Sequence, residues 1–426
     1  MTDPTQLSAR ECAARIARGE LSAERLMQAL LARVQEREPQ VRAWEWLDPQ
    51  QALAAARASD AGAAPGPLRG VPVALKDLID TADMPTAYGS PIYAGHRPRT
   101  DAACVARLKQ AGAIAMGKTV MTEFASFHPG RTANPHNPAH TPGGSSSGSA
   151  AAVAAGMAPV ALGTQTAGSV IRPAAFCGVV GYMPSGGLLN RVGVKMISDS
   201  LDTLGVFARS VDDAAFLVSV LAERPELDAA GPARAPRLGL YRTPEWARAE
   251  PATEAALARA QQALQRAGSE VGEPRDGGAF DGLAEAHACL MQYEIARSLL
   301  PEWLSHREQF SAALRRIMET GLAFTAQDYD AARAAVARAR AALDGLFGDC
   351  DALLVPAAPG EAPRGLDATG DPVFNRMWTA LRAPCVGVPA GAGPQGLPVA
   401  VQVVGRPGDD ARTLWVARAV EAALAG

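Results

Sequence analysis

The sequence has few of the features that mark membrane-bound or secreted proteins. No apolar run approaches the roughly 20 residues that a membrane-spanning helix needs, and the polar N-terminus lacks the apolar core of a secretion signal. The six cysteines lie far apart without a CxxC pair, so we expect reduced, packed thiols and no disulfide framework. These absences favour a cytoplasmic protein that does not act at a membrane.

Metal-binding and nucleic-acid-binding patterns are also missing. The six histidines show no HExxH or HxH spacing. His128, His136 and His140 cluster in the stretch FHPGRTANPHNPAHTP, but no carboxylate or cysteine joins them, so we expect a hydrogen-bonded loop and neither a metal nor another cofactor. The net charge of -3 and the pI near 6.1 give no basic surface for nucleic acid.

Lysine is the scarcest charged residue. Only four of the 41 basic residues are lysines, namely Lys76, Lys109, Lys118 and Lys195. A chain that almost always uses arginine for surface charge has few lysines without a specific role. Each of the four is therefore a candidate for one.

The length and the hydrophobic pattern predict an α/β protein with a large core. The 426 residues are 48% hydrophobic. The buried strand VPVALKDLID, the amphipathic helix TDAACVARLKQAGA and the strand AIAMGKT alternate along the chain. We expect helices within residues 1–60, with Ser22 as an N-cap, and at 211–222, 252–267, 278–300, 326–345 and 409–424.

The sequence shows no repeat and no long linker, so we predict a single domain over 1–426. Residues 1–60 form its N-terminal helical segment. A composition shift near 225–250 marks at most an inserted helical lobe, over 225–345.

A run of seven small residues, Gly-Gly-Ser-Ser-Ser-Gly-Ser, fills positions 143–149. A flexible linker is disfavoured, because the run lies in the most apolar part of the chain. A phosphate-binding loop would need a GxxxxGK[ST] pattern, which is absent. A G-x-S-x-G nucleophile elbow on Ser146 needs a strand directly before it, and the preceding NPHNPAHTP holds three prolines.

A second cluster, GTQTAGS over 163–169, ends an apolar strand in a tight turn. The N–H groups of Thr166, Ala167, Gly168 and Ser169 can converge there next to the Ser169 hydroxyl. Acyl transfer requires such donors beside a nucleophile. A plain strand-to-helix turn would look similar, so this motif is weak alone.

Lys76 lies at the end of the apolar strand VPVALK. The flanking valines and leucines suggest that its ammonium group is buried, although a lysine at a strand end often extends to the surface. Burial disfavours the charged form, and a pKa near 7 would need a shift of about 3 units. Asp77 is adjacent, but on an extended chain it points to the other face.

Taken together and in this order, these motifs resemble the amidase signature family. GVPVALKD, GKTVMTEFA, the GGSSSGSAAA run, GTQTAGSVIRPAAFCG, SLDTLGVFARSVDDAA, FNRMWTALRAPCVGVPAG and GLPVAVQVVG extend the resemblance over most of the chain. It implies a large mixed, twisted β-sheet flanked by helices on both faces. It also implies a Ser–cis-Ser–Lys triad without a metal or cofactor.

Carried over by position, the triad is Lys76 as base, Ser145 as the cis-serine and Ser169 as nucleophile, with Thr166, Ala167 and Gly168 forming the oxyanion hole. Ser145 is chosen as the first serine after Gly-Gly, with the cis bond at Gly144–Ser145. Ser169 would attack an amide carbonyl to form an acyl-enzyme, which water then hydrolyses. The expected partner is a small-molecule amide, and a homodimer is the assembly considered.

Two residues bear on the substrate. Gln165 stands where the family more often has aspartate, which would alter the charge beside the oxyanion loop. Arg172, three residues after Ser169, could grip a substrate carboxylate and so favour an acidic monoamide. A salt bridge to Asp202 or a helix-packing role is the alternative for Arg172.

Other functions stay open beside a free-standing amidase. The glutamine-amidase subunit of a tRNA-dependent amidotransferase resembles this chain, with Gln165 and Val170-Ile171-Arg172 as the features against it. An ester hydrolase would use the same acyl-serine chemistry. A catalytically silent scaffold is disfavoured, because all three triad residues are retained.

Overall fold

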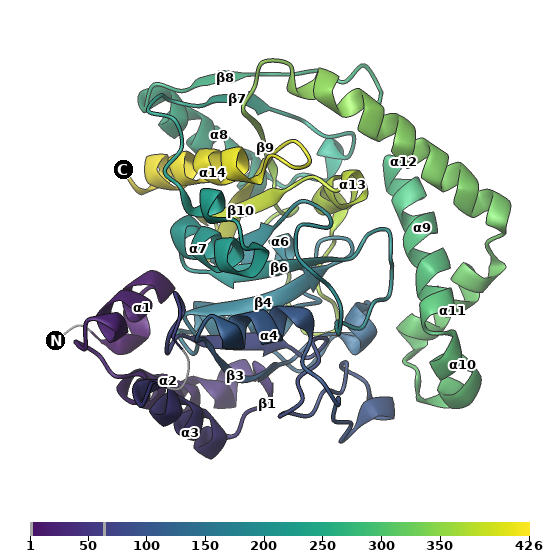
Figure 1. The fold of residues 1–426 in the computed structure, drawn as a ribbon. Helices are drawn as coiled ribbons and strands as arrows, with labels where there is room; N and C mark the ends of the chain where they lie inside the picture. Colours follow the sequence, from purple (N-terminus) through teal and green to yellow (C-terminus); the bar gives the residue numbers. More distant parts are fainter. Residues whose placement is uncertain (1–2, 63–64) are drawn as a thin grey trace.

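The computed structural model describes residues 3–62 and 65–426, and within them one sheet of eleven strands forms the centre (Figure 1). The strand order is β1-β3-β2-β4-β6-β5-β10-β11-β9-β7-β8. β2 is parallel to β3 and β4, and β7 is parallel to β8 and β9, whereas the other neighbours are antiparallel. The predicted large mixed sheet is confirmed. The strands are β1 Trp44–Trp46, β2 Pro72–Lys76, β3 Ile114–Thr119, β4 Val160–Gln165, β5 Val180–Met183, β6 Thr203–Ala208, β7 Arg237–Leu240, β8 Glu270–Gly272, β9 Ala352–Pro356, β10 Cys385–Ala392 and β11 Pro398–Val404.

Helices cover both faces of the sheet, as predicted. α5 and α6 pack together on one face, and α4, α7, α14 and α8 follow one another across the other face. None of the helices in the described residues is long and apolar enough to cross a membrane. The helices are α1 Ala9–Ala17, α2 Ala23–Val41, α3 Pro49–Asp60, α4 Ala103–Gln110, α5 Ser147–Ala154, α6 Ile171–Cys177, α7 Val211–Ala222, α8 Pro251–Arg266, α9 Leu283–Ser298, α10 Leu300–His306, α11 Ala312–Ala323, α12 Ala326–Phe347, α13 Val373–Leu381 and α14 Asp410–Ala425.

The two strands that matter most for the site are β2 and β4. Every residue of both strands is buried, which explains their continuous runs of small and apolar residues. They lie side by side and parallel, with Leu75 opposite Leu162. Because parallel strands end at the same edge of a sheet, Lys76 and the turn after Gln165 meet at that edge.

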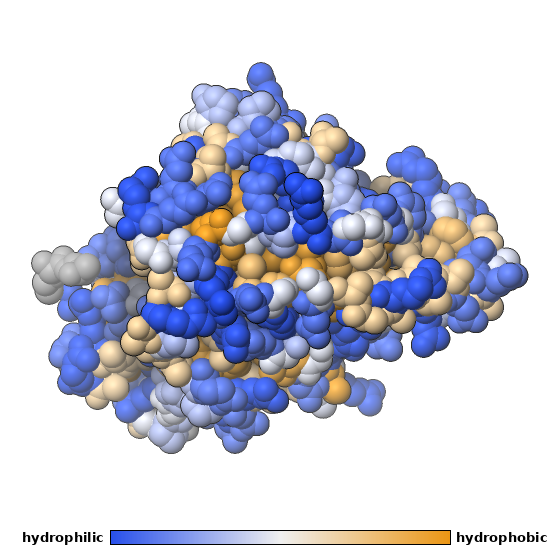
Figure 2. Space-filling model, turned by 90° about the horizontal axis from the view of Figure 1, so that it is seen from above, coloured by the Kyte–Doolittle hydropathy of each residue, from blue (hydrophilic) through white to orange (hydrophobic). Residues whose placement is uncertain are grey.

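Helices α9 to α12 form a lobe that projects from the main body (Figures 1 and 2). Within it, α9 packs against α11 and α12, and it also contacts α13 of the main body. Residues 225–345, for which a helical lobe was considered, also contain β7 and β8 of the sheet. Hydrophilic side chains cover most of the face seen in Figure 2.

The predicted helices agree closely with the observed ones. Residues 211–222 coincide with α7, and Ser22 caps α2 by accepting a hydrogen bond from the N–H of Arg25. The pattern failed for short elements. It missed β1 inside the segment 1–60 predicted as helical, and it missed α10, α11 and α13.

Candidate active site

Lys76 ends β2 and is completely buried. Its Nζ donates hydrogen bonds to Ser145 Oγ and to Thr164 Oγ1, both at 2.7 Å. Burial lowers the pKa of Lys76 to about 7, and the negative charge of Asp202 only partly opposes this shift. A large fraction of Lys76 is therefore a neutral amine near neutral pH, as the sequence predicted.

Ser145 lies in the small-residue loop that leads into α5. The peptide bond between Gly144 and Ser145 is cis, as the resemblance implied. The next two serines hold the loop, also as expected, because Ser146 Oγ bonds to the backbone of Thr164 and Ser147 Oγ donates to Val120 O. Ser146 is thus occupied by backbone groups, and no strand precedes it, so the elbow interpretation fails.

Ser169 lies in the turn between β4 and α6. Within the described part of the chain, its Oγ has no hydrogen-bond partner, and the N–H groups of residues 166–169 donate to no acceptor. Two carbonyl groups of this turn, in contrast, accept hydrogen bonds from neighbouring side chains. His287 Nε2 donates to Thr166 O at 2.8 Å, and Thr379 Oγ1 donates to Ala167 O at 2.8 Å. The turn therefore keeps a row of free donors beside a free hydroxyl.

Asp202 and His287 stabilise this turn from two sides. Asp202 accepts a hydrogen bond from Thr166 Oγ1 at 2.5 Å. Burial lowers the pKa of His287 to about 4, so its ring is neutral. Since a carbonyl can only accept, Nε2 carries the proton.

Gly168 is required by a close neighbour. A Cβ atom at this position would lie 2.4 Å from Asn375 Oδ1 and 2.9 Å from Pro372 Cβ. The amide nitrogen of Asn375 donates to Ala357 O and to Gln402 Oε1, which fixes the side chain in this place. The oxyanion loop thus rests directly on the residues at the start of α13.

Arg172 is buried in the first turn of α6, and it lines the same pocket as Ser169. Its Nη2 donates to Gly144 O at 2.6 Å and to Thr369 Oγ1 at 3.1 Å, which ties α6 to the loop of Ser145. Its Nε and Nη1 are buried and have no partner among the described residues. Burial lowers the pKa of Arg172 to about 9, opposed in part by Asp371.

The salt bridge considered between Arg172 and Asp202 is absent from the described structure. Besides Thr166, Asp202 accepts hydrogen bonds from the N–H groups of Ile197 and Ser198. Arg172 therefore has a structural bond to Gly144 and unused donors beside the pocket.

Gln165 lies beside the oxyanion loop, as expected, and does not line the pocket at Ser169. Its Oε1 accepts hydrogen bonds from the N–H groups of Val170 and Ile171, at the start of α6. Its Nε2 donates to Thr379 Oγ1 at 3.0 Å. The side chain therefore caps the start of α6. An aspartate at this position could accept the same hydrogen bonds but could not donate one, whereas the amide of Gln165 does both.

The pocket at Ser169 is small and mostly apolar, with a volume of about 20 Å³. Residues from five parts of the chain line it. The loop after β3 supplies Ala125, Ser126 and Phe127, and the projecting lobe supplies Met291 and Ile295 of α9. Thr166, Ala167, Ile197 and Pro372 complete the wall with Ser169 and Arg172.

Sequence reasoning missed several residues of this site. Thr164, His287 and Thr379 each bond to the triad or to its loop. Thr164 lies inside the GTQTAGS cluster but was not identified as a site residue, and the other two lie in helices that looked purely structural. Thr164 precedes Ser169 by five residues. Side chains alternate between the two faces of β4, and this alternation was the available signal that Thr164 points toward the site. His287 and Thr379 come from distant helices, and only the tertiary fold brings them here.

The described residues contain no group of three or more His, Cys, Asp or Glu side chains that could hold a metal ion. His136 Nε2 bonds to Cys177 O, and His140 Nδ1 bonds to Ala362 O. These two histidines of the Pro/Asn-rich stretch thus have the hydrogen-bonded loop role that was expected. The six cysteines are free thiols.

Comparison with known proteins agrees with this geometry. The profile of the Amidase family matches residues 25–414. A protein from Anaeromyxobacter dehalogenans, named as one of the subunits of glutamyl-tRNA(Gln) amidotransferase, is 38% identical over 98% of this chain and 96% of that protein.

Solved structures give the same result. One described as a crystal structure of amidase has a TM-score of 0.89 and 32% identity, over 98% of this chain and 99% of the other. Native peptide amidase from Stenotrophomonas maltophilia has a TM-score of 0.81 and 31% identity, over 98% and 96%. With its mixed sheet and its match over residues 25–414, the chain belongs to the amidase signature family.

Proposed function

We propose that this protein hydrolyses a carboxamide through an acyl-enzyme on Ser169, with Ser145 and Lys76 as the proton relay. The observation that carries the proposal is the row of unpaired N–H groups at residues 166–169 beside the free Ser169 hydroxyl. Lys76, with a pKa lowered to about 7 and a 2.7 Å bond to Ser145, supplies a base for it. In this proposal the protein acts in the cytoplasm.

The proposed reaction has two halves. Neutral Lys76 takes the proton of Ser145, Ser145 takes that of Ser169, and Ser169 Oγ attacks the amide carbon. The N–H groups of Thr166, Ala167 and Gly168 stabilise the negative oxygen that forms. The relayed proton goes to the leaving nitrogen as the C–N bond breaks. Water then attacks the acyl-serine by the same relay and releases the carboxylic acid.

The relatives favour glutamine as the amide. The curated proteins at 34–38% identity are named as subunits of glutamyl-tRNA(Gln) amidotransferase. The main sequence argument against that assignment was Gln165, and its side chain caps α6 away from the pocket. In this form of the proposal the chain releases ammonia from glutamine within a larger assembly, so a small molecule is not its only partner.

A free-standing amidase is the second candidate, and the pocket supports it. The structural neighbours include an amidase and a peptide amidase at about the same level of identity. The spare donors of Arg172 beside the mostly apolar lining favour a substrate with a carboxylate, which is the acidic monoamide predicted from the sequence. An ester with the same acyl group would pass through the same intermediate.

The nucleophile is tested by a serine-directed covalent reagent and by Ser169→Ala. We expect the reagent to label Ser169 in the wild type, and the variant to fold normally while losing several orders of magnitude in amide hydrolysis. Ser126→Ala is the matched control, because Ser126 lines the same pocket but donates to Glu123 O. Labelling of Ser146, or full activity without the Ser169 hydroxyl, would contradict the assignment.

The amide is identified with a substrate panel on the purified wild-type chain. Glutamine, small acidic monoamides, neutral amides and the matching esters are compared by the release of ammonia or alcohol. Activity on glutamine that requires the other components of an amidotransferase supports the first candidate. Full activity of the isolated chain on a monoamide supports the second candidate.

The role of Arg172 is tested with Arg172→Lys and Arg172→Met. If its spare donors hold a substrate carboxylate, Arg172→Met lowers kcat/KM for an acidic amide by roughly 30- to 1000-fold, and a neutral amide of the same size is affected less. Because Arg172 also bonds to Gly144 O, some loss on both substrates is expected. Equal losses on both, with a lower thermal midpoint, would leave only the structural role.

A further inference from the structure

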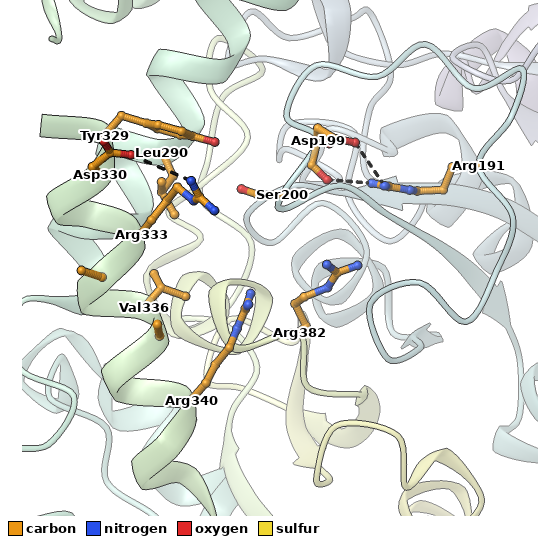
Figure 3. A pocket seen from close by; sticks show the side chains of 12 residues that line it. Arg191, Asp199, Ser200, Leu290, Tyr329, Asp330, Arg333, Val336, Arg340 and Arg382 are labelled. Carbon is orange, nitrogen blue, oxygen red and sulfur yellow. Dashed lines mark hydrogen bonds and ion pairs between the residues drawn. The ribbon is translucent and has the colours of Figure 1, made fainter. Parts of the chain in front are cut away.

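A second hollow, with a volume of about 790 Å³, lies between the lobe and the main body (Figure 3). It shares no lining residue with the pocket at Ser169. Arg333 and Arg340 reach into it from α12, and Arg382 reaches into it from the end of α13. Arg191 lines its far side.

These four arginines are not equally neutralised. Arg191 donates to Asp199 and to the carbonyl oxygen of Asp202. Arg333 has a long contact of 3.9 Å with Asp330, and its guanidinium carbon lies 5.7 Å from the centre of the Tyr329 ring. Arg340 donates two N–H groups to Ala380 O, a neutral acceptor.

Arg382 is the most unusual of the four. Its guanidinium is half-buried, yet it makes no hydrogen bond or ion pair with any described residue. It also lies close to Arg340. The pKa of Arg340 is lowered mainly by burial and, to a smaller extent, by the positive charge of Arg382. Two positive groups thus repel each other in one hollow with no carboxylate between them.

A polar group without a partner also lines the hollow. Ser200 Oγ is buried, and no group in the described structure bonds to it. The aspartates of the lining are Asp199 and Asp330, so the hollow has a net charge of +2. Unpaired guanidinium groups with an unpaired hydroxyl suit an anion that accepts several hydrogen bonds.

The excess of positive charge is smaller beyond this hollow. The adjacent hollow shares Arg340 and Arg382 and adds Arg224 and Arg406, but Asp344, Asp409 and Asp410 also line it. A nucleic acid needs a series of basic contacts along its backbone, which these carboxylates interrupt. A compact ligand with about two negative charges fits better.

We propose that Arg333, Arg340 and Arg382 form a binding site for a compact phosphate dianion, either free phosphate or the phosphate monoester of a small molecule. Arg382 binds phosphate oxygens with its planar fork, Arg340 does so with the N–H groups that Ala380 O leaves free, and Arg333 closes the site from α12. Ser200 donates to a third oxygen after a small movement. This site is separate from the amide-hydrolysing site and does not depend on its assignment.

The test is calorimetric titration of the wild-type chain with inorganic phosphate, at constant ionic strength kept with chloride. We expect saturable binding with a Kd of about 0.1–5 mM, because two or three exposed guanidinium contacts give several kcal/mol. Arg382→Met and Arg340→Met should each weaken binding at least about tenfold. Arg338→Met is the matched control, since Arg338 is exposed on the same helix but does not line the hollow.

A second measurement keeps the test independent of folding defects. Because Arg382 repels Arg340, Arg382→Met should keep or raise the thermal midpoint without phosphate while abolishing the rise that phosphate causes. A phosphate monoester that binds more tightly than inorganic phosphate identifies a small molecule as the source. Absence of saturation, equal weakening by Arg338→Met, or tighter binding of a short RNA through the same arginines would overturn the proposal.

Discussion

At the scale of single residues, two buried lysines have opposite surroundings. Lys76 bonds to two hydroxyl groups and has no carboxylate within ion-pair distance in the described residues. Lys118, which lies opposite Leu75 in the neighbouring strand β3, donates to Ile79 O and Thr86 Oγ1 and lies 3.5 Å from Asp77. Lys118 thus has a charged partner, and only Lys76 can lose its proton without leaving a carboxylate unpaired.

The low pKa of Lys76 predicts a pH dependence of activity. Because the base must be neutral, kcat/KM should rise with pH through about 7 and level off above it. Lys76→Arg should be nearly inactive across this range, since arginine stays protonated. A measured pH profile decides the matter, and substantial activity of Lys76→Arg would exclude Lys76 as the base.

The same shift predicts a pH dependence of stability. The folded state releases the Lys76 proton near pH 7, whereas the unfolded chain keeps it until about pH 10.5. Between these values the unfolded state binds more protons, so the free energy of unfolding rises with pH by up to about 1.4 kcal/mol per unit. Lys76→Met should lack this slope in denaturant titrations at pH 7 to 9.5.

Lys118→Met is the control for that measurement. Removing Lys118 leaves the carboxylate of Asp77 buried without its partner, which should cost about 3–5 kcal/mol of stability. The slope with pH that comes from Lys76 should remain in this variant. A slope that is equal in wild type and Lys76→Met would show that the lysine titrates normally.

The residue scale also shows where sequence reasoning reached its limit. The position and burial of Lys76 followed from the apolar strand around it, but the strand AIAMGKT also has a lysine of the same appearance, Lys118, just before its end. Only the tertiary contact between Lys118 and Asp77 separates the two. Gln165 was expected to alter the charge beside the oxyanion loop, and the direction of its side chain could not be read from its position in the sequence.

At the scale of elements, α13 supports the oxyanion loop. Thr379 Oγ1 donates to Ala167 O and receives a hydrogen bond from Gln165, and Asn375 touches Gly168. The helix lies more than 200 residues from the loop in sequence, which is why no local pattern revealed it. The strands and long helices were predictable because each has a hydrophobic pattern of its own in the sequence. The contact between α13 and the oxyanion loop joins two distant segments, and no such pattern marks it.

Gly168→Ala tests this support. The added methyl group would meet Asn375 Oδ1 and Pro372, so the loop must move and at least one oxyanion donor is displaced. We expect kcat to fall by about 10²–10³ with the overall fold retained. Gly345→Ala in α12 is the control, because its methyl group meets nothing and should stabilise the helix by about 0.5–1 kcal/mol. Unchanged kcat in Gly168→Ala would mean that the loop position is not important for catalysis.

At the scale of the whole molecule, the lobe is attached to the body at a charged and aromatic contact. Glu302 of α10 accepts hydrogen bonds from Lys195 at 2.6 Å and from Tyr93 at 2.7 Å. The ammonium group of Lys195 also lies 5.1 Å from the centre of the Tyr93 ring and 5.6 Å from that of Phe124. Since Met291 and Ile295 of the lobe line the pocket, this contact helps to fix one pocket wall.

Glu302→Gln should loosen the lobe without unfolding the body. The neutral amide loses the ion pair with Lys195, and we expect faster hydrogen exchange in α10 and α11 with little change in α5 or α7. KM should rise more than kcat falls, because the pocket wall moves while the triad stays in place. Uniformly faster exchange, or none, would contradict a local attachment. Glu319→Gln is the control, since its ion pair with Arg307 stays within the lobe.

The burial of lysine has a practical consequence for labelling this protein. The side chains of Lys76 and Lys118 are completely buried, and those of Lys195 and Lys109 are 19% and 34% exposed. Reagents that acylate side-chain amines therefore find one main target on the described surface, Lys109 in α4. A fluorophore or a solid support coupled in this way would sit on the face of the sheet covered by α4 and α7, and every molecule would have the same orientation.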